Sequence, residues 1–340
     1  MKVVALVESE SHVCCRYRIA AFRPFLERAG YELVIRALPK TLAKRVPIYR
    51  EARTAGAVVV QRKLLRGLEV ALLRRWTRTL IFDYDDAVWL RDSYSSKGFR
   101  SLKRASRFWA ITRAADATFA GNEYLAKQAR RYTYADRVAV IPTCVDPTAY
   151  PVAGDRPAGG PVRLVWVGSA STLRGLDRFR DTLEQVGRAV PGIRLKLICD
   201  KFLEFDHLPV DRVPWAEATE AAEIATADIG IGWVPDDPWS RGKCGLKLLQ
   251  YQAAGLPVVA NPVGVQADFV RDGVTGFRAG TPEQWAAAVS ALAADAALRR
   301  KLGAAGRRQV EETYSVAAGA RLWVEQLDRL CRPTPVNTSG

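Results

Sequence analysis

The chain has 340 residues, a formal charge of +15 at pH 7 and a hydrophobic content of 49%. This length exceeds what one ordinary hydrophobic core supports, so we expect two domains of about 150 to 170 residues. No apolar run reaches the roughly 18 residues of a membrane span, and the first strand runs directly into Glu8. We therefore predict neither a membrane helix nor a signal peptide, and expect a cytoplasmic protein.

The cysteines and histidines do not form a metal or disulfide pattern. There are six cysteines without a C-x-x-C pair, and only two histidines. Neither a zinc site nor a disulfide framework is indicated, so we expect reduced thiols.

Positive charge is concentrated in the first part of the chain. Residues 1–150 hold 28 Lys and Arg against 14 Asp and Glu, whereas residues 151–340 hold 23 against 22. Arginine used only to cover surfaces would be spread evenly. A basic half favours an acidic partner, such as anionic lipid headgroups, a phosphorylated acceptor or nucleic acid.

The first half alternates between predicted strands and helices. Strands are predicted at residues 2–7, 32–36, 57–60, 80–83, 118–122 and 138–141, and helices at residues 18–30, 64–76 and 123–132. Such alternation predicts a parallel sheet covered on both faces.

Three loops follow the carboxyl ends of these strands, where parallel sheets bind ligands. The first, residues 8–18, contains Arg16 and Arg18. The second brings together three carboxylates in the run Asp83-Tyr84-Asp85-Asp86, and the third spans residues 143–147.

A linker is predicted at residues 151–160, which are rich in proline and glycine. A second alternating series follows it, with a tight loop at residues 168–172. The expected strands are residues 163–167, 195–199, 229–233 and 258–260; the expected helices are residues 176–186, 215–226, a short one around Asp268, those from Pro282 onward and 315–330. The fold class is therefore α/β, with two Rossmann-like parallel-sheet domains.

The stretch from Ser240 to Asn261 reads as loop, helix, turn and strand. Gly242 and Gly245 open the helix, and its free N–H groups can hold an anion. Lys243 and Lys247 are four residues apart and are predicted to add two positive charges on one face. The alternative is a surface helix with two solvated lysines, but the intervening residues Cys, Gly and Leu disfavour it.

Several other nucleotide-binding and catalytic motifs are absent. No G-x-G-x-x-G follows either first strand, and a Walker A alignment at Gly242-Lys243 fails at both ends. There is no G-x-S-x-G elbow, and nothing supports His12 or His207 as a catalytic base.

The chain resembles the GT-B fold glycosyltransferases, most closely the retaining nucleotide-sugar enzymes of family 4. The motifs that carry the resemblance are residues 242–276, with Ala253-Ala254-Gly255-Leu256-Pro257-Val258-Val259 and Asp272-Gly273-Val274-Thr275-Gly276, together with Asn122-Glu123-Tyr124-Leu125 and residues 141–146. It implies an acceptor-side domain at residues 1–155, a donor-binding domain at 161–314 and a C-terminal helix at 315–331 that returns to the first domain. Residues 332–340 are expected to be a disordered tail.

The resemblance also implies a donor site. The backbone amides of Cys244, Gly245 and Leu246 would meet the donor diphosphate, with Gly168 and Ser169 in the loop beside it. The family's E-x7-E glutamates fall on Gly242 and Gln250, so both are absent. Gln250 is expected to contact the ribose, and Asp236 or Asp237 to contact the sugar.

Catalytic residues carried over from the family are only partly present. Arg174 is the one basic residue near the family's Arg/Lys pair, so Lys243 and Lys247 are expected to neutralise part of the phosphate charge. Asp85-Asp86 align with the family's His-Asp pattern, where a carboxylate orients a hydroxyl or, alternatively, caps the next element. Arg16 and Arg18 are assigned to the acceptor side.

The resemblance implies transfer of a sugar from a nucleoside-diphosphate sugar to an acceptor hydroxyl, with retention. A helix N-terminus and lysines can stabilise the departing diphosphate without a metal. We therefore expect no cofactor, and do not predict Asp83-Tyr84-Asp85, although it spells DxD, as a metal ligand. The expected acceptor is a glycan, a lipid-linked molecule or another hydroxyl compound of cell-surface glycan biosynthesis, reached at the inner membrane face.

Two other classes remain open. A catalytically silent nucleotide-sugar-binding protein is suggested by the missing glutamates. A nucleic-acid-binding protein is permitted by the charge, but no recognisable RNA or DNA module supports it.

We predict that the basic first domain binds anionic membranes. Arg62-Lys63, Arg74-Arg75 and Lys103-Arg104 would each add about 1 kcal/mol per side chain near the surface. Co-sedimentation of the separately expressed domains with neutral and anionic vesicles should show binding by the first domain, lost as salt screens the charges. Equal binding by both domains, or none by the first at low salt, would contradict this prediction.

Overall fold

The computed structural model describes residues 1–154 and 160–332, which form two compact units. The first unit comprises residues 1–144, 242–244 and the chain from Val316 onward; the second comprises residues 145–241 and 245–315. The second unit begins ahead of the predicted linker, and residues 155–159 of that linker lie outside the described residues. So do residues 333–340 of the predicted tail.

The first unit is built around a six-stranded sheet in the order β2-β1-β3-β4-β5-β6, in which all neighbours are parallel. Val3 lies in register between Leu33 and Ala57. Helices cover both faces, which explains why the central strands are continuous apolar runs. The strands are β1 (Lys2–Val7), β2 (Glu32–Ala37), β3 (Ala57–Gln61), β4 (Leu80–Tyr84), β5 (Ala117–Ala120) and β6 (Val138–Val140).

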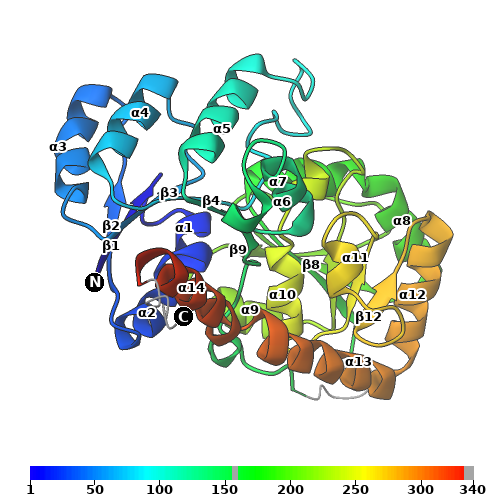
Figure 1. Cartoon of the computed structure of the whole chain (residues 1–340). Coiled ribbons are helices and arrows are strands. Elements are labelled where there is room, and N and C mark those ends of the chain that lie inside the picture. Colours follow the sequence, from blue (N-terminus) through cyan, green and yellow to red (C-terminus); the bar gives the residue numbers. More distant parts are fainter. Residues whose placement is uncertain (155–159, 333–340) are drawn as a thin grey trace. The chain divides into compact units, whose positions relative to one another are not determined.

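In Figure 1, α3, α4 and α5 lie on one face of this sheet, and α1, α2 and α14 lie on the other. Trp323 of α14 is buried, with its ring 4.8 Å from that of Phe119 and 5.9 Å from that of Phe22. The prediction that the last helix returns to the first domain is therefore confirmed. The helices are α1 (Val13–Arg18), η1 (Ala20–Phe22), α2 (Arg23–Arg28), α3 (Leu42–Ala52), α4 (Gly67–Trp76), α5 (Leu102–Ala114), α6 (Glu123–Ala129), η2 (Ala135–Arg137) and α14 (Val316–Cys331).

The prediction of one helix over residues 18–30 is wrong. A first helix, α1, starts at Val13 inside the predicted loop, where His12 Nδ1 accepts a hydrogen bond from Cys14 N at 3.2 Å. The chain leaves helical geometry at Ile19, and Pro24 lies in the first turn of the next helix, a position that tolerates its missing N–H. Helices α3 and α5 were not predicted.

The second unit repeats the architecture with the order β12-β11-β10-β7-β8-β9, again all parallel. The prediction of two Rossmann-like parallel sheets is confirmed. Strands β9 and β12 were not predicted; β9 has the sequence Val-Asp-Arg-Val-Pro, and none of its residues is fully buried. The strands are β7 (Arg163–Val167), β8 (Arg194–Cys199), β9 (Val210–Pro214), β10 (Ile229–Gly232), β11 (Val258–Ala260) and β12 (Gly276–Arg278).

The helices of the second unit fill the connections between these strands. They are η3 (Pro147–Ala149), α7 (Ala170–Arg178), α8 (Arg180–Ala189), α9 (Glu220–Ala225), η4 (Ser240–Gly242, whose last residue belongs to the first unit), α10 (Leu246–Ala253), α11 (Gln266–Phe269), α12 (Pro282–Ala294), α13 (Ala296–Gln309) and the π-helical turn η5 (Val310–Tyr314). Among the described residues of both units, no helix is long and apolar enough to cross a bilayer.

Candidate functional site

Each sheet has one point at which the strand order reverses. In the first sheet this switch point lies between β1 and β3, because β2 adds to one side of β1 and β3 to the other; in the second sheet it lies between β7 and β10. Open parallel sheets bind ligands in the crevice outside the carboxyl ends of the strands at such a point. The loops after β1 and β3, and those after β7 and β10, are therefore the places to look for a site.

In the second unit, Lys247 reaches the switch point. Its Nζ donates to the carbonyl oxygen of Val167, the last residue of β7, and lies 4.5 Å from the centroid of the Trp166 ring. A Cβ atom at Gly168 would lie 2.7 Å from this nitrogen, so glycine leaves the room that the lysine side chain occupies. The structure thus brings together two of the predicted site residues, Gly168 and Lys247.

Helix α10 lies within the predicted stretch, but it begins at Leu246, after Lys243. Gly245 is its N-cap in left-handed geometry, with φ of 62°, and its carbonyl accepts from Leu248 N at 3.0 Å. Since the helix starts at Leu246, the prediction that Lys243 and Lys247 share one helical face is wrong. The first turn of α10 carries one lysine.

Ser169 lies in the loop that follows β7, and Arg174 lies in the next helix, α7. Ser169 is the N-cap of α7, and Ala170 N donates to Asp200 Oδ1 at 2.6 Å. The Cys199 thiol and this N–H lower the pKa of Asp200. A carboxylate of the protein therefore already contacts the start of α7. Arg174 is exposed, and within the described chain it has no hydrogen bond or ion pair.

Gln250 and Asp237, which were also predicted to contact the donor, make hydrogen bonds within the second unit. Gln250 is 2% exposed, and its amide donates to Tyr150 Oη at 3.1 Å, which argues against the expected contact with ribose. Asp237 lies in the loop after β10, and its Oδ1 accepts from Ser240 N, the first residue of η4, at 2.8 Å. Its neighbour Asp236 pairs with Arg241 at 2.7 Å on the surface.

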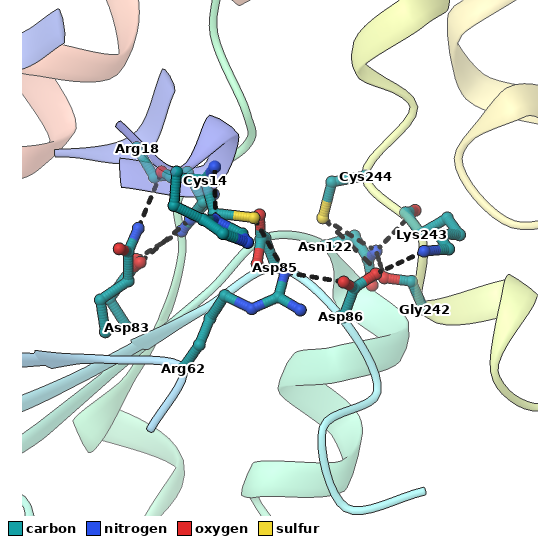
Figure 2. A network of polar contacts seen from close by, with 12 residues as sticks. Cys14, Arg18, Arg62, Asp83, Asp85, Asp86, Asn122, Gly242, Lys243 and Cys244 are labelled. Atoms are coloured by element: carbon teal, nitrogen blue, oxygen red, sulfur yellow. Dashed lines mark hydrogen bonds and ion pairs between the residues drawn. The ribbon is translucent and has the colours of Figure 1, made fainter. Parts of the chain in front are cut away.

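In the first unit, a network of four charged side chains joins the ends of β3 and β4 to Lys243 of the segment 242–244 (Figure 2). Arg62 Nη1 lies 2.7 Å from Asp85 Oδ1 and 2.7 Å from Asp86 Oδ2, and Lys243 Nζ lies 3.2 Å from Asp86 Oδ1. Arg62 itself has φ of 57°, a left-handed conformation that costs a non-glycine residue about 1 to 2 kcal/mol. The backbone strain is compensated by the two carboxylates that the arginine reaches.

These contacts fix the charges of the network. Burial disfavours the charged form of Arg62, but Asp85 and Asp86 outweigh it and raise its pKa. Burial likewise works against ionised Asp85, but Arg62 and Arg18 lower its pKa below the usual range. Burial opposes the charge on Lys243, and Asp86 raises its pKa. Asp85 is thus held as a carboxylate with a cation at its oxygen, which is unsuited to a general base.

Arg18 is not placed on the acceptor side as predicted. It is 1% exposed and grips Asp83 with two nitrogens, at 2.5 and 3.1 Å, while Nη1 donates to Ile141 O at 2.9 Å. Burial raises the pKa of Asp83, against the opposing effect of Arg18. Arg16 folds over its neighbour Tyr17, 4.6 Å from the ring centroid. Arg18 is therefore a core residue that ties the end of β4 to the end of β6.

Residues 242–244 are held in the first unit by Asn122, a contact that the sequence did not reveal. Asn122 Nδ2 donates to Gly242 O at 3.3 Å and to Lys243 O at 3.2 Å, while its Oδ1 caps α6 at Leu125 N. A Cβ atom at Gly242 would lie 2.9 Å from the backbone nitrogen of Ala87. The absence of a side chain at Gly242 thus lets this segment approach the backbone of Ala87 rather than a ligand.

The DxD run does not form a cluster of free carboxylates. Asp83 and Asp85 pair with Arg18 and Arg62, and no group of three or more His, Cys, Asp or Glu side chains in the described chain is arranged to hold a metal. All six cysteines are free. Burial raises the pKa of the Cys14 and Cys244 thiols and brings that of Cys144 to about 12, so these thiols stay protonated.

Comparison with known proteins supports this fold. Residues 161–295 match the model of the family described as Glycosyl transferases group 1. No curated protein matches the chain in sequence.

Similar solved structures span the whole chain. HepE from Anabaena, in complex with UDP and glucose, has a TM-score of 0.69 at 15% identity, covering 97% of this chain and 100% of that one. Sucrose-phosphate synthase from Thermosynechococcus elongatus has a TM-score of 0.72 at 18% identity, covering 98% and 100%. The lipopolysaccharide outer core galactosyltransferase WaaB, in its apo form, has a TM-score of 0.67 at 11% identity, covering 97% and 99%. The chain therefore has the GT-B fold.

Replacing Arg62 by Met should destabilise the protein by about 3 kcal/mol at pH 7, because the largely buried Asp85 loses its ion-pair partner and Asp86 keeps only Lys243. The orphaned Asp85 carboxylate would have a raised pKa, so its cost is present above the unfolded pKa and shrinks as the pH falls toward 5. Urea unfolding at both pH values measures this.

The matched control is Arg74→Met, which breaks a pair with Asp116 at 3.2 Å that is only partly buried. It should cost under about 1 kcal/mol at either pH. Equal losses in the two variants would show that the Arg62 network does not stabilise the fold.

Proposed function

We propose that the protein is a retaining glycosyltransferase that binds a nucleoside-diphosphate sugar in its second unit. The observation that carries the proposal is the position of Lys247, whose ammonium lies at the carboxyl end of β7 beside the switch point. The family match over residues 161–295 includes β7, Lys247 and all of α10. HepE, which shares the fold, is seen with UDP and glucose.

The proposed catalytic effect is electrostatic. When the sugar leaves, negative charge develops on the β-phosphate of the nucleoside diphosphate. Backbone N–H groups at Gly245 and Leu246, at the start of α10, would donate to that phosphate, and Lys247 would neutralise it. Arg174, exposed on α7, is a further candidate because its side chain is free to move toward an anion. No step requires a metal.

The first unit would supply the acceptor side. Asp86 lies between Arg62 and Lys243, and would orient an acceptor or donor hydroxyl as a fixed carboxylate rather than remove a proton as a free base. We expect the acceptor to be a glycan or lipid-linked molecule of cell-surface glycan synthesis, met in the cytoplasm at the inner membrane face. WaaB, a lipopolysaccharide galactosyltransferase with the same fold, is consistent with this class.

A protein that binds nucleotide sugars without turnover is the second candidate. It is favoured by the two positions where the family carries glutamate, since Gly242 packs against Ala87 and Gln250 is buried. A thermal-shift screen over nucleotide sugars, starting with UDP-glucose, followed by turnover assays, separates the two, because ligands that bind the folded state raise its Tm.

Lys247→Ala should reduce transfer about a hundredfold, the scale of losing one preorganised contact to developing charge, and should weaken nucleoside-diphosphate binding. Lys301→Ala, an exposed lysine on α13 of the same unit, is the control and should leave both unchanged. Single-turnover rates and UDP titrations measure the effects. Unaltered transfer in Lys247→Ala would remove this lysine from the site.

Transfer should also persist after chelation of divalent metals. We expect the initial rate to be the same with and without excess EDTA, because the helix N-terminus and Lys247 would stabilise the phosphate charge in place of a metal ion. Complete loss of activity with EDTA, restored by Mn²⁺ or Mg²⁺, would show that the metal-free proposal is wrong.

A further inference from the structure

The first unit contains a basic pocket of about 580 Å³. Its walls come from the chain after β2, the loop after β3, the first turn of α4 and helix α5. Both loops lie at the carboxyl edge of the sheet, next to the β1–β3 switch point. Six cations line this pocket, namely Lys40, Arg45, Lys63, Arg66, Lys103 and Arg107.

Most of this charge is not neutralised by the protein. Glu69 is the one carboxylate in the lining, and it is taken by Arg45 at 2.7 Å. Lys63 pairs with Glu8 at 3.0 Å. In the described parts of the chain, no acidic side chain lies within ion-pair distance of the other four cations: Lys40, Arg66, Lys103 and Arg107.

The pocket has a fixed floor. Glu69 is 5% exposed; its Oε1 accepts from Arg45 and, at 3.5 Å, from Tyr49 Oη, while its Oε2 accepts from Arg66 N at 3.2 Å. On the wall, Arg107 Nη1 donates to Leu64 O at 3.4 Å. Burial, with Glu69, raises the pKa of Tyr49 to about 12, so this buried group stays neutral. This floor fixes the base of a pocket that is open to solvent, and the exposed side chains of Lys40, Arg66 and Lys103 stand around it.

We propose that this pocket binds a phosphate or diphosphate group carried by the acceptor. The assignment of this phosphate to the acceptor rests on the proposed function, whereas the binding of an anion to the pocket does not. Arginine forks match phosphate oxygens in pairs, and four unpaired cations exceed what a single carboxylate would neutralise. The volume falls in the range of small-molecule sites and holds more than one phosphate. The ligand would be a soluble sugar phosphate or the headgroup of a phospholipid or lipid-linked diphosphate.

Isothermal titration of the full chain with inorganic pyrophosphate tests the pocket. Lys103→Gln with Arg107→Gln should weaken binding about a hundredfold, tenfold for each charge-assisted contact. The control, Arg104→Gln with Arg113→Gln, removes the same charge from the same helix outside the pocket lining and should change affinity less than about threefold. Equal losses in both double variants, or no binding by the wild type at low salt, would overturn the proposal.

Lys247→Ala and UDP-glucose separate this pocket from the donor site. Pyrophosphate binding that is lost in Lys247→Ala but kept in the pocket variant would place the anion at the donor site and overturn the proposal. The pocket variant should bind UDP-glucose like the wild type. If the wild type binds no nucleotide sugar, the proposed function fails, while the pyrophosphate titrations still report on the pocket.

The two sources of phosphate are told apart with glucose 1-phosphate and with phosphatidylcholine vesicles that contain or lack phosphatidic acid. Glucose 1-phosphate binding that depends on Lys103 and Arg107 supports a soluble acceptor. Vesicle binding that needs phosphatidic acid and is lost only in the pocket variant supports a lipid one. Vesicle binding reduced equally in the pocket and control variants would indicate general surface charge and overturn the pocket.

Discussion

Three carboxylates within four residues, Asp83, Asp85 and Asp86, lie at the carboxyl end of β4, and their neutralisation organises this edge of the first unit. Each is largely withdrawn from water, so each needs a cation close by. Arg18 pairs with Asp83, Arg62 with Asp85 and Asp86, and Lys243 with Asp86. The strained backbone of Arg62 and the clamp of Asn122 on residues 242–244 both serve to bring these cations into place. This edge of the sheet therefore holds paired charges rather than an open acidic site.

This pairing divides the positive charge of the chain into two kinds. Arg18, Arg62 and Lys243 are committed to carboxylates of their own unit, so they add little field outside it. The cations around the basic pocket are different, because Lys40, Arg66, Lys103 and Arg107 have no acidic partner within the described chain. Part of the charge excess of residues 1–150 is therefore concentrated around that pocket. A solvated surface would spread it instead over many screened side chains.

The sequence predicted those features that depend on neighbouring residues. Buried strands such as β1 and β3 are continuous apolar runs, and Gly245 and Gly255 take the left-handed conformations that bound α10. Pairs of charged residues that lie far apart in the chain could not be predicted from the sequence. Arg18 is 65 residues from Asp83, and nothing local distinguishes it from Arg16. Helix α3 was missed because it contains Pro47. Helix α5 was overlooked among its charged residues, although Phe108 and Ile111 lie three residues apart on its buried face.

Position 242 has no room for a side chain larger than that of glycine. A Cβ atom would lie 2.9 Å from both the nitrogen and the Cβ of Ala87, and 3.0 Å from a methyl group of Leu125. No larger residue fits unless the clamp of Asn122 on this segment is released, which would also withdraw Lys243 from Asp86. The Lys243–Asp86 pair therefore depends on the close packing that glycine at position 242 allows. Under the proposed function, a contact to the donor sugar would have to come from other residues, and the loop after β10, with Asp236 on its surface, follows a strand that borders the switch point of the second sheet.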